Sequence, residues 1–557
     1  MNLGELLLDR RLVTDEQLAE ASERARGGQR LDRALLELGY VQEDDLLRLA
    51  GEELAIELVD LSRVEVPREA VQAVPSRIVH QKAIVPVARR NGTLRVATSD
   101  PFDLYALDEL RLLTGLQIEP VLAPAYQVRQ LIKTYYGLGG NTLDAMLDEQ
   151  GVSVVSGTDG EGQAEDLLQM AQEASVIKLV NEVFIEAFSE RASDIHIEPY
   201  ENDLKVRYRV DGVLQDAKVP PQVKRFQAAI VSRIKIMAQL NIAEKRLPQD
   251  GRIKLQLGGR QIDIRVSVIP MLFGEGVVMR ILDKGNVLYT LPQLGMPEDS
   301  HAVFQREIER PNGIILVTGP TGSGKTTTLY AALQAIINGE IKVLTVEDPV
   351  EYHLEGVNQI QVNPKIEFTF ARGLRAILRH DPDVVMIGEI RDYETAEAAI
   401  QAALTGHLVL STLHTNDACS AATRLIDMGV EPFLVTSTLN AAMAQRLVRT
   451  ICPQCKAPYT FGREQLPPDF EPPVGGQLMR GTGCRHCNQT GYRGRTGIYE
   501  LMVSSDELRE KIMERAPSHL LERVARAQGM RLLREDGWLK VKQGVTTPDE
   551  VARMARM

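Results

Sequence analysis

Hydrophobic residues in the first sixty positions repeat at an interval of 28 residues. In each copy they are spaced as on one face of a short helix, which is followed by a turn and the start of a second helix. The repeating positions are Leu3, Leu7, Leu8, Val13 and Leu18 in the first copy and Leu31, Leu35, Leu36, Val41 and Leu46 in the second. The pattern predicts a helical N-terminal domain over residues 1–60, in which Thr14 caps a helix.

Two further segments precede the larger part of the chain. Residues 61–140 alternate short strand patterns, such as Leu94–Ala97, with helical patterns over Leu104–Thr114 and Ala125–Tyr136, which predicts a second N-terminal α+β domain. Residues 141–165 are rich in glycine, serine and acidic residues and show no sustained periodicity. We therefore expect a flexible linker there.

The remaining two domains differ in the arrangement of their strands. Over residues 166–285, a helix that ends near Arg191 is followed by alternating strands and a helix over Gln222–Gln239, which predicts an α+β domain. From residue 290 to residue 557, apolar strands alternate with helices. This order is typical of an α/β domain with a parallel sheet covered on both faces.

Length and composition agree with a globular chain of several domains. The 557 residues predict three or four domains, and 44% hydrophobic with 25% charged residues exclude a wholly disordered protein. The net charge of −12 argues against coating of nucleic acid or anionic lipid. No apolar run has the length of a membrane span or the pattern of a signal peptide, and five cysteines do not make a disulfide framework, so we expect a cytoplasmic protein.

A phosphate-binding loop is the clearest chemical motif. Gly319–Thr326 fits the pattern G-x-x-x-x-G-K-[ST] between the apolar strand Gly313–Val317 and a helix that starts at Lys325. Its glycines allow backbone N–H groups to surround phosphates, Lys325 would reach the β and γ phosphates, and Thr326 would bind Mg²⁺. The predicted ATP-binding residues are Gly319, Pro320, Thr321, Gly322, Ser323, Gly324, Lys325, Thr326 and Thr327.

Polar residues also follow three other buried strands of the predicted sheet. These clusters are Glu347–Glu351, Gly388–Asp392 and Thr412–Asn416. Open α/β sheets bind their ligands at the carboxyl ends of the strands, where the phosphate loop also lies. The three clusters therefore predict water activation, metal binding and sensing of the γ phosphate.

Four of the five cysteines form two closely spaced pairs. Cys452 with Cys455 and Cys484 with Cys487 are each separated by two residues, and 28 residues lie between the pairs. Two such knuckles in a reducing compartment are typical of a tetrahedral zinc site with four cysteine ligands, while a redox pair or two simple thiol pairs remains an alternative. We expect a zinc subdomain over about 450–495.

The four nucleotide motifs, in this order, resemble the Walker A, Asp box, Walker B and His box of the type II secretion and type IV pilus assembly ATPase superfamily. Ser193–Glu198, Arg207–Gly212 and Pro248–Arg252 resemble the domain that precedes the ATPase core in that family, and Thr345–Pro349 and Ala371–Arg379 look most like its type II secretion ATPase E (GspE) branch. The resemblance implies a RecA-like P-loop ATPase core of class α/β, a preceding α+β domain, a tetracysteine zinc subdomain, C-terminal helices and α-rich N-terminal domains. It further implies a hexameric cytoplasmic ATPase that powers pseudopilus assembly and protein export by a type II secretion system, with type IV pilus extension as the alternative.

The resemblance also assigns roles to individual residues. Glu347 would be the general base that orients the attacking water, and Glu389 would complete the Mg²⁺ site through water, with the division of work between these carboxylates left open. His414 would sense the γ phosphate, ahead of His407 in the same motif. Arginines of the preceding domain reach the nucleotide in this family, so the candidates for charge stabilisation are Arg207 and Arg209, followed by Arg252 and Arg280.

The N-terminal repeat resembles a bipartite module that binds cyclic diguanylate through Arg-Leu-Gly motifs in some family members. The copies here read Asn2-Leu3-Gly4 and Arg30-Leu31-Asp32, so each departs at one position. These departures favour docking to the cytoplasmic domain of an inner-membrane partner over cyclic diguanylate binding, and the resemblance adds an inner-membrane platform protein as a partner. A nucleic-acid motor and a nucleotide-switched scaffold are the other interpretations, and 5% aromatic residues with a negative net charge count against direct nucleic-acid contact.

Overall fold

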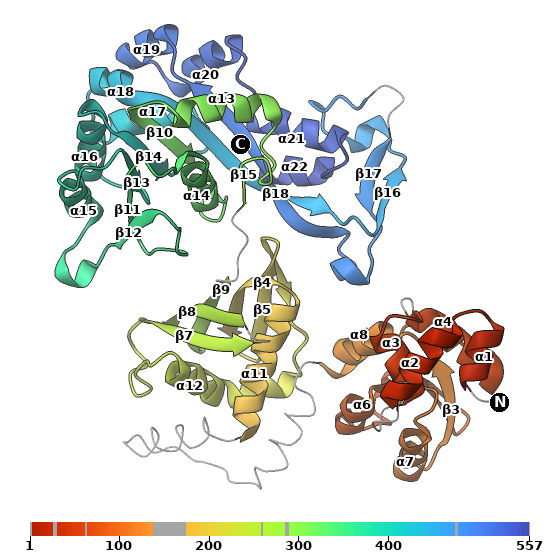
Figure 1. Cartoon of the computed structure of the whole chain (residues 1–557). Coiled ribbons are helices and arrows are strands. Elements are labelled where there is room, and N and C mark those ends of the chain that lie inside the picture. The colour runs from red at the N-terminus through yellow and green to blue at the C-terminus, as the bar shows by residue number, and fades with distance from the viewer. Residues whose placement is uncertain are drawn as a thin grey trace. The chain divides into compact units, whose positions relative to one another are not determined.

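The chain folds into two compact units, Met1–Leu282 and Asp283–Met557. Its computed structural model (Figure 1) describes residues 3–25, 30–61, 64–137, 174–257, 260–283, 289–473 and 477–555. The predicted linker over residues 141–165 lies outside the described residues.

Four short helices form the N-terminal repeat. They are α1 (Leu3–Asp9), α2 (Asp15–Ala25), α3 (Leu31–Glu37) and α4 (Glu43–Leu54). Each helix of the second pair begins 28 residues after its counterpart in the first pair. The Thr14 hydroxyl accepts a hydrogen bond from the backbone N–H of Gln17 at 3.3 Å and so caps α2. The predicted helical repeat is therefore confirmed.

A three-stranded sheet with flanking helices follows. Its elements are α5 (Arg68–Val71), α6 (Ser76–Lys82), β1 (Ile84–Arg90), β2 (Thr93–Thr98), α7 (Leu104–Thr114), β3 (Gln117–Leu122) and α8 (Ala125–Tyr136). Strand β2 pairs antiparallel with β1 and parallel with β3, and α7 makes the crossover between the two parallel strands. The two predicted helices are confirmed, whereas β3 was not predicted, because Pro120 lies in the middle of a short strand that also contains Gln117 and Glu119.

A six-stranded sheet with its helices completes the first unit. Its elements are α11 (Ala174–Ser189), β4 (Ala192–Pro199), β5 (Leu204–Val210), β6 (Val213–Asp216), the 3₁₀ helix η2 (Pro221–Phe226), α12 (Gln227–Met237), β7 (Gln249–Leu257), β8 (Arg260–Met271) and β9 (Gly274–Asp283). The strand order is β6-β5-β4-β9-β8-β7, and one apolar core joins the sheet to α11 and α12. The single helix predicted over Gln222–Gln239 is wrong in its first turn, because Pro221 starts a 3₁₀ helix that changes to α12 at Gln227.

The second unit is built on a seven-stranded sheet. Its strands are β10 (Gly313–Thr318), β11 (Val343–Glu347), β12 (Val357–Gln361), β13 (Val384–Ile387), β14 (Leu408–Leu413), β15 (Leu439–Ile451) and β18 (Tyr492–Val503), in the order β12-β11-β13-β14-β10-β15-β18. The first six strands are parallel, as predicted. The prediction of a wholly parallel sheet is wrong at β18, which is antiparallel to β15, because the chain returns to this edge from the cysteine-rich segment instead of through a crossover helix.

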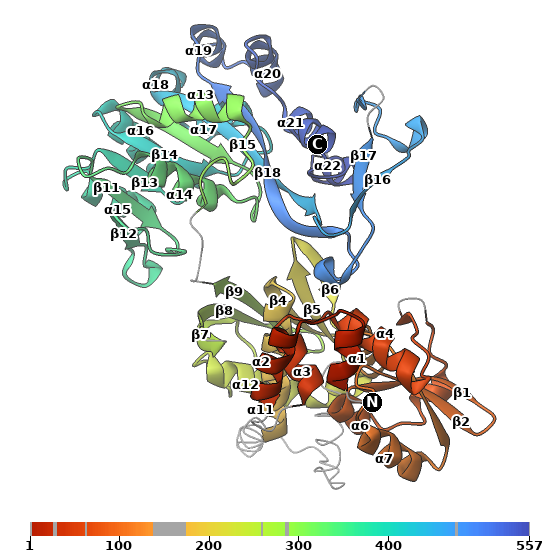
Figure 2. The same cartoon turned by 45° about the vertical axis from the view of Figure 1, so that its right-hand side comes forward.

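Helices cover both faces of this sheet (Figure 2). One face packs on α13 (Glu298–Ile308) and α14 (Lys325–Ile336), and the other on α15 (Phe370–Ile377), α16 (Tyr393–Leu404), α17 (Ser420–Asp427) and α18 (Pro432–Thr438). Along β10, Ile314 and Leu316 enter one core while Ile315 and Val317 enter the other. Because side chains alternate along a strand, a run that is apolar at every position is buried on both faces.

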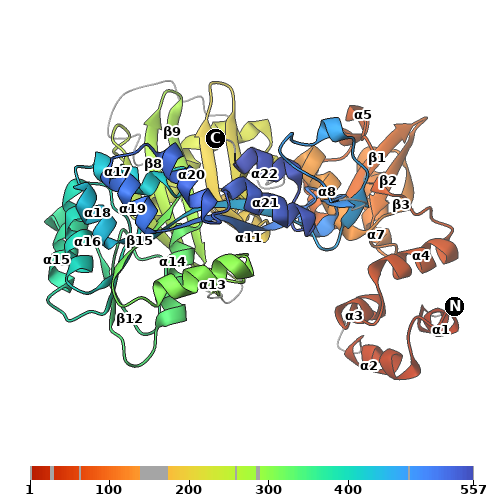
Figure 3. The same ribbon diagram turned by 90° about the horizontal axis from the view of Figure 1, so that it is seen from above.

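The C-terminal helices and a small two-stranded sheet complete the second unit. Helices α19 (Asp506–Met513), α20 (Ser518–Ala527), α21 (Leu533–Lys542) and α22 (Pro548–Met554) follow one another across it (Figure 3). The smaller elements are η3 (Pro364–Ile366), β16 (Lys456–Tyr459), η4 (Arg463–Gln465), β17 (Leu478–Gly481) and η5 (Arg485–Cys487), with β16 antiparallel to β17. Among all the helices described, none is both long and apolar enough to span a membrane.

Candidate nucleotide site and metal centre

The phosphate loop connects β10 to α14 at the carboxyl edge of the parallel sheet. Its three glycines have positive φ angles, 144° at Gly319, 79° at Gly322 and 88° at Gly324. A Cβ atom at Gly319 would lie 2.6 Å from both the carbonyl oxygen of Gln445 and the hydroxyl of Ser323. Glycine is therefore required at this position, and the loop keeps the tight backbone path that turns N–H groups toward a phosphate.

Lys325 lies folded over the beginning of this loop. Its Nζ donates to the carbonyl oxygens of Gly319 at 2.8 Å and Pro320 at 3.0 Å. Burial lowers the pKa of Lys325 to about 8, with Arg446 acting in the same direction and Glu389 against it. The ammonium group is thus held in a partly dehydrated position, where an anionic ligand would raise its pKa again and stabilise its charge.

Ser323 is a buried residue of the loop whose hydroxyl has no partner among the residues described. The side chain is only 4% exposed, and its oxygen makes no hydrogen bond. A buried hydroxyl without a partner costs free energy, and a phosphate oxygen would satisfy it. Thr326 and Thr327 follow on the first turn of α14, partly exposed and next to the loop. The residues present therefore fit a bound nucleoside triphosphate.

Glu389 and His414 come together at the ends of neighbouring strands. Glu389 follows β13 and His414 follows β14, and His414 Nε2 lies 3.4 Å from the Glu389 carboxylate. Glu389 also forms an ion pair with Arg391, and its charge acts on Lys325. Because Glu389 is partly accessible and lies within the field of the lysine, it could hold a Mg²⁺ ion or an ordered water beside the phosphates.

Glu347 lies at the last position of β11 and is much more buried than the sequence suggests. Its side chain is 2% exposed. One carboxylate oxygen accepts hydrogen bonds from Thr345 at 2.6 Å and Gln359 at 3.1 Å, and the other accepts one from the Tyr330 hydroxyl. The prediction of Glu347 as the general base stays a prediction, and the sequence pattern does not indicate this network, which comes from α14, β12 and β11 itself.

His407 lies away from the other predicted site residues. His407 directly precedes β14, and the first residues of β14 and β10 are paired. It therefore lies at the amino edge of the sheet, whereas the phosphate loop follows β10 at the carboxyl edge. Its Nδ1 is 2.8 Å from the Ala402 carbonyl oxygen and 3.1 Å from the Thr405 hydroxyl. The two histidines of this motif thus lie at opposite ends of one strand, and only His414 is near Glu389.

Arg207 and Arg209 lie on β5 of the first unit. Arg207 is paired with Glu198. Arg209 Nε lies 3.8 Å from Asp194, and its Nη1 donates to the Gly212 carbonyl oxygen at 3.3 Å. Both side chains are partly exposed, and their assignment to the nucleotide stays a prediction.

Arg446 is a charged residue near the loop that the sequence motifs do not predict. From β15, its Nη2 donates to the carbonyl and side-chain oxygens of Asn416 at 3.2 and 3.3 Å, and its Nη1 lies 3.0 Å from where a Gly319 Cβ would be. Burial lowers its pKa despite the opposing charges of Glu500 and Asp417. A signal was present, because Gln445 and Arg446 directly follow the mostly apolar first half of strand β15.

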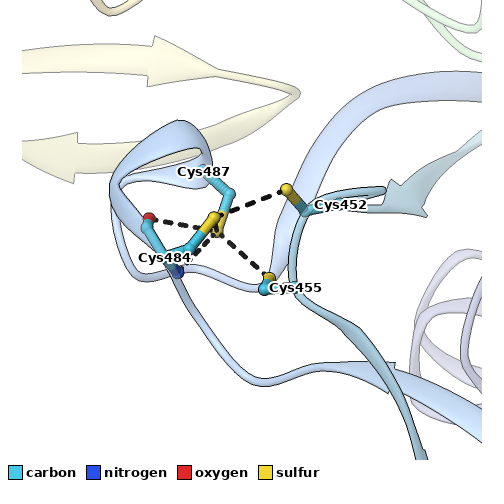
Figure 4. Close-up of side chains that lie close together, drawn as sticks. All are labelled: Cys452, Cys455, Cys484 and Cys487. Atoms are coloured by element: carbon cyan, nitrogen blue, oxygen red, sulfur yellow. Dashed lines mark hydrogen bonds between the residues drawn. The ribbon is translucent and has the colours of Figure 1, made fainter. Parts of the chain in front are cut away.

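The four paired cysteines converge on one point (Figure 4). Their sulfur atoms all lie within 4.8 Å of one another. The Sγ distances are 3.7 Å from Cys452 to Cys484, 3.8 Å from Cys455 to Cys487 and 3.7 Å from Cys484 to Cys487. Thiolates about 2.3 Å from a tetrahedral zinc ion would be about 3.8 Å apart, so the cluster fits such a metal.

Fold and site together define a RecA-like P-loop ATPase. The phosphate loop lies at the carboxyl edge of a parallel sheet, and β14 lies between the loop strand β10 and the Glu389 strand β13. The chain belongs to a known family, since the family model described as type II/IV secretion system protein matches residues 169–553. A second family model, the MshEN domain, matches residues 54–142.

Similar proteins extend over almost the whole chain. A type II secretion system protein E of Xanthomonas campestris is 46% identical over 99% of this chain and 97% of its own length. A type IV pilus assembly ATPase PilB of Myxococcus xanthus is 44% identical over 99% of this chain and 98% of its own length. Among solved structures, the ATPase DotB of Legionella pneumophila covers 67% of this chain and 94% of its own, at 22% identity and a TM-score of 0.49.

Proposed function

We propose that this protein hydrolyses ATP to power pseudopilus assembly and protein export by a type II secretion system. The observation that carries the proposal is the phosphate loop with Lys325, Glu389 and His414 at one sheet edge, in a chain that matches a type II secretion system protein E along its length. Type IV pilus extension is the second candidate, because the Myxococcus relative of similar coverage is named as a pilus assembly ATPase.

In this proposal each part of the site has one task. Residues 319–327 surround the ATP phosphates, and Lys325 neutralises the β and γ phosphates. Thr326 and Glu389 hold Mg²⁺, which polarises the phosphate oxygens when it is bound. His414 senses the γ phosphate, Glu347 orients the attacking water, and Arg207 and Arg209 stabilise the charge that develops during transfer.

The cysteine cluster has a structural task in this proposal. Four cysteine ligands complete the coordination of zinc and leave no position for a substrate, so the metal holds β15, η5 and the small β16–β17 sheet together. The backbone N–H groups of Cys484 and Gly491 donate to Cys487 Sγ at 3.2 and 3.3 Å, as expected for a thiolate ligand.

The assembly and its partners are further parts of the proposal, which the resemblance to the family supports. We propose a homo-hexamer in the cytoplasm that lies at the inner membrane through an inner-membrane platform protein and a second membrane partner, with no direct nucleic-acid contact. The N-terminal units would dock to the cytoplasmic domain of that partner. Arg30 supports docking over cyclic diguanylate binding, because its Nη2 already lies 2.5 Å from Asp32 and 2.7 Å from Asp100. A titration of the full chain with cyclic diguanylate tests this point, and tight binding would restore the nucleotide as a ligand.

Lys325→Ala is the direct test of the proposed ATPase. We expect loss of ATP turnover with unchanged zinc content and little change in thermal unfolding, because the hydrogen bonds of this ammonium group to the described residues are confined to its own loop. Turnover at the wild-type rate would overturn the mechanism. In cells whose secretion depends on this chain, the same variant should abolish export of secreted proteins and leave surface pili intact, while loss of pili with intact export would favour the second candidate.

A further inference from the structure

The Glu347 carboxylate is held only by uncharged donors. Thr345, Gln359 and Tyr330 all donate to it, and it forms no ion pair within the part of the chain that the structure describes. Each carboxylate oxygen has two lone pairs, so the oxygen that accepts from Tyr330 alone keeps one for a further hydrogen. Tyr330 is the donor on the oxygen that carries this free lone pair, so its hydroxyl, together with the two donors on the other oxygen, fixes the direction of the lone pair.

Tyr330 belongs to the same helix as the phosphate-binding lysine. It lies in the middle of α14, is 1% exposed, and its ring packs edge-to-face on Tyr352 with the centroids 4.7 Å apart. The Tyr330 oxygen also accepts weak hydrogen bonds from the Glu351 N–H and the Gln359 amide, both at 3.4 Å. Because donors occupy its lone pairs, the hydroxyl hydrogen has to point to Glu347.

We propose that Tyr330 is a positioning residue for ATP hydrolysis, whose hydroxyl fixes the Glu347 carboxylate relative to the helix that binds the phosphates. The inference rests on the proposed function, in which Glu347 orients the attacking water. Helix α14 carries both Lys325, which would contact the phosphates, and Tyr330, which contacts the Glu347 carboxylate. The distance between the bound phosphates and this carboxylate is therefore kept when the loop adjusts to ATP. Positioning of this kind affects the rate of the chemical step more than the binding of the substrate.

Tyr330→Phe tests this role in the full-length chain. It removes one oxygen and keeps the ring packing on Tyr352. We expect kcat to fall about tenfold or more, with KM for ATP within about twofold of the wild type. Tyr352→Phe is the matched control, because the Tyr352 hydroxyl makes no hydrogen bond among the residues described, and its kcat should stay unchanged.

A double variant separates positioning from general destabilisation. If Tyr330 acts through Glu347, then Tyr330→Phe should cause no further loss of kcat when it is added to Glu347→Gln. Independent losses that multiply, an unchanged kcat, or a loss confined to KM would each overturn the inference. Glu347→Gln with wild-type turnover would instead refute the proposed role of Glu347, so the two failures are distinguishable.

A second variant, Gln359→Met, tests the same network if Tyr330→Phe does not fold. The Gln359 amide donates to both Tyr330 and Glu347, so Gln359→Met loosens the same pair from β12. Its loss of kcat should again disappear in the Glu347→Gln background. A further loss of kcat from Gln359→Met in the Glu347→Gln background would contradict the proposal that these residues act through Glu347.

Discussion

At the scale of single residues, the low pKa of Lys325 makes ATP binding depend on pH. Burial lowers this pKa to about 8, so above that pH the lysine of the empty site is largely neutral. Phosphates favour the charged form, and binding at high pH must therefore be accompanied by uptake of a proton. We expect the dissociation constant for ATP to rise by up to about tenfold per pH unit above pH 8.

Titrations with a fluorescent ATP analogue at pH 7, 8 and 9 would measure this dependence. Lys325→Arg is the control, because an arginine keeps its charge over this whole range and should remove the dependence. The same dissociation constant at pH 7 and pH 9 in the wild type would show that Lys325 does not lose its proton in the empty site.

Glu500 makes the stability of the second unit depend on pH. Its two oxygens accept hydrogen bonds from the N–H groups of Ala418 at 2.8 Å and Leu533 at 3.2 Å. Burial nevertheless raises the pKa of Glu500 from 4.5 to about 7. The folded state then binds more protons than the unfolded state between these values, so the free energy of unfolding should fall as pH rises, by about 3 kcal/mol across the window.

Urea unfolding at pH 5 and pH 8 would measure that change. Trp538 is the one tryptophan in the sequence and is buried in α21, so its fluorescence reports this unit. The glutamine of Glu500→Gln cannot ionise. The free energy of unfolding that this variant loses relative to the wild type should therefore be smaller at pH 8 than at pH 5. The same difference in free energy of unfolding between variant and wild type at both pH values would show that Glu500 is already ionised at pH 5.

The residues of the site that are close together in sequence were predictable, and those brought in from other elements were not. The phosphate loop is a continuous motif whose strand and helix follow from local patterns. The positions of Glu389 and His414 follow from the rule that parallel strands end at one edge. Arg446 and Tyr330 carry no motif, because strand order and helix rotation place them and a sequence pattern does not specify either one.

At the scale of elements, patterns with a clear period were predictable and long-range pairing was not. Helices α7 and α8 have the predicted bounds, because their apolar residues recur with the helical period. The reversal at β18 could not be predicted, since an apolar strand looks the same in either direction. The division of the chain into four domains and a linker stays a prediction.

The cysteine cluster leads to a prediction for the elements around it. We expect about one zinc ion per chain, and Cys455→Ser should release it and lower the thermal unfolding temperature, because the ligands join the end of β15 to η5. Elemental analysis of the purified chain measures the metal. Cys419→Ser is the control, since Cys419 is buried outside the cluster and its loss should leave the zinc content unchanged. A chain that contains no zinc after purification in zinc-containing medium would contradict the assignment.

At the scale of the whole molecule, the proposed function assigns nucleotide binding to the second unit and stabilisation of the reacting charge to arginines of the first unit. The phosphate loop belongs to Asp283–Met557, whereas Arg209 belongs to Met1–Leu282, where its Nη1 donates to the Gly212 carbonyl oxygen. We expect Arg209→Ala to lower kcat by about 10³-fold, as for removal of an arginine that stabilises phosphoryl transfer, and to leave ATP affinity unchanged. Lys205→Ala, which removes an exposed cation from the same strand, should be silent. ATPase rates and ATP binding of the two variants measure both quantities, and wild-type turnover by Arg209→Ala would show that the first unit does not supply this charge to the reaction.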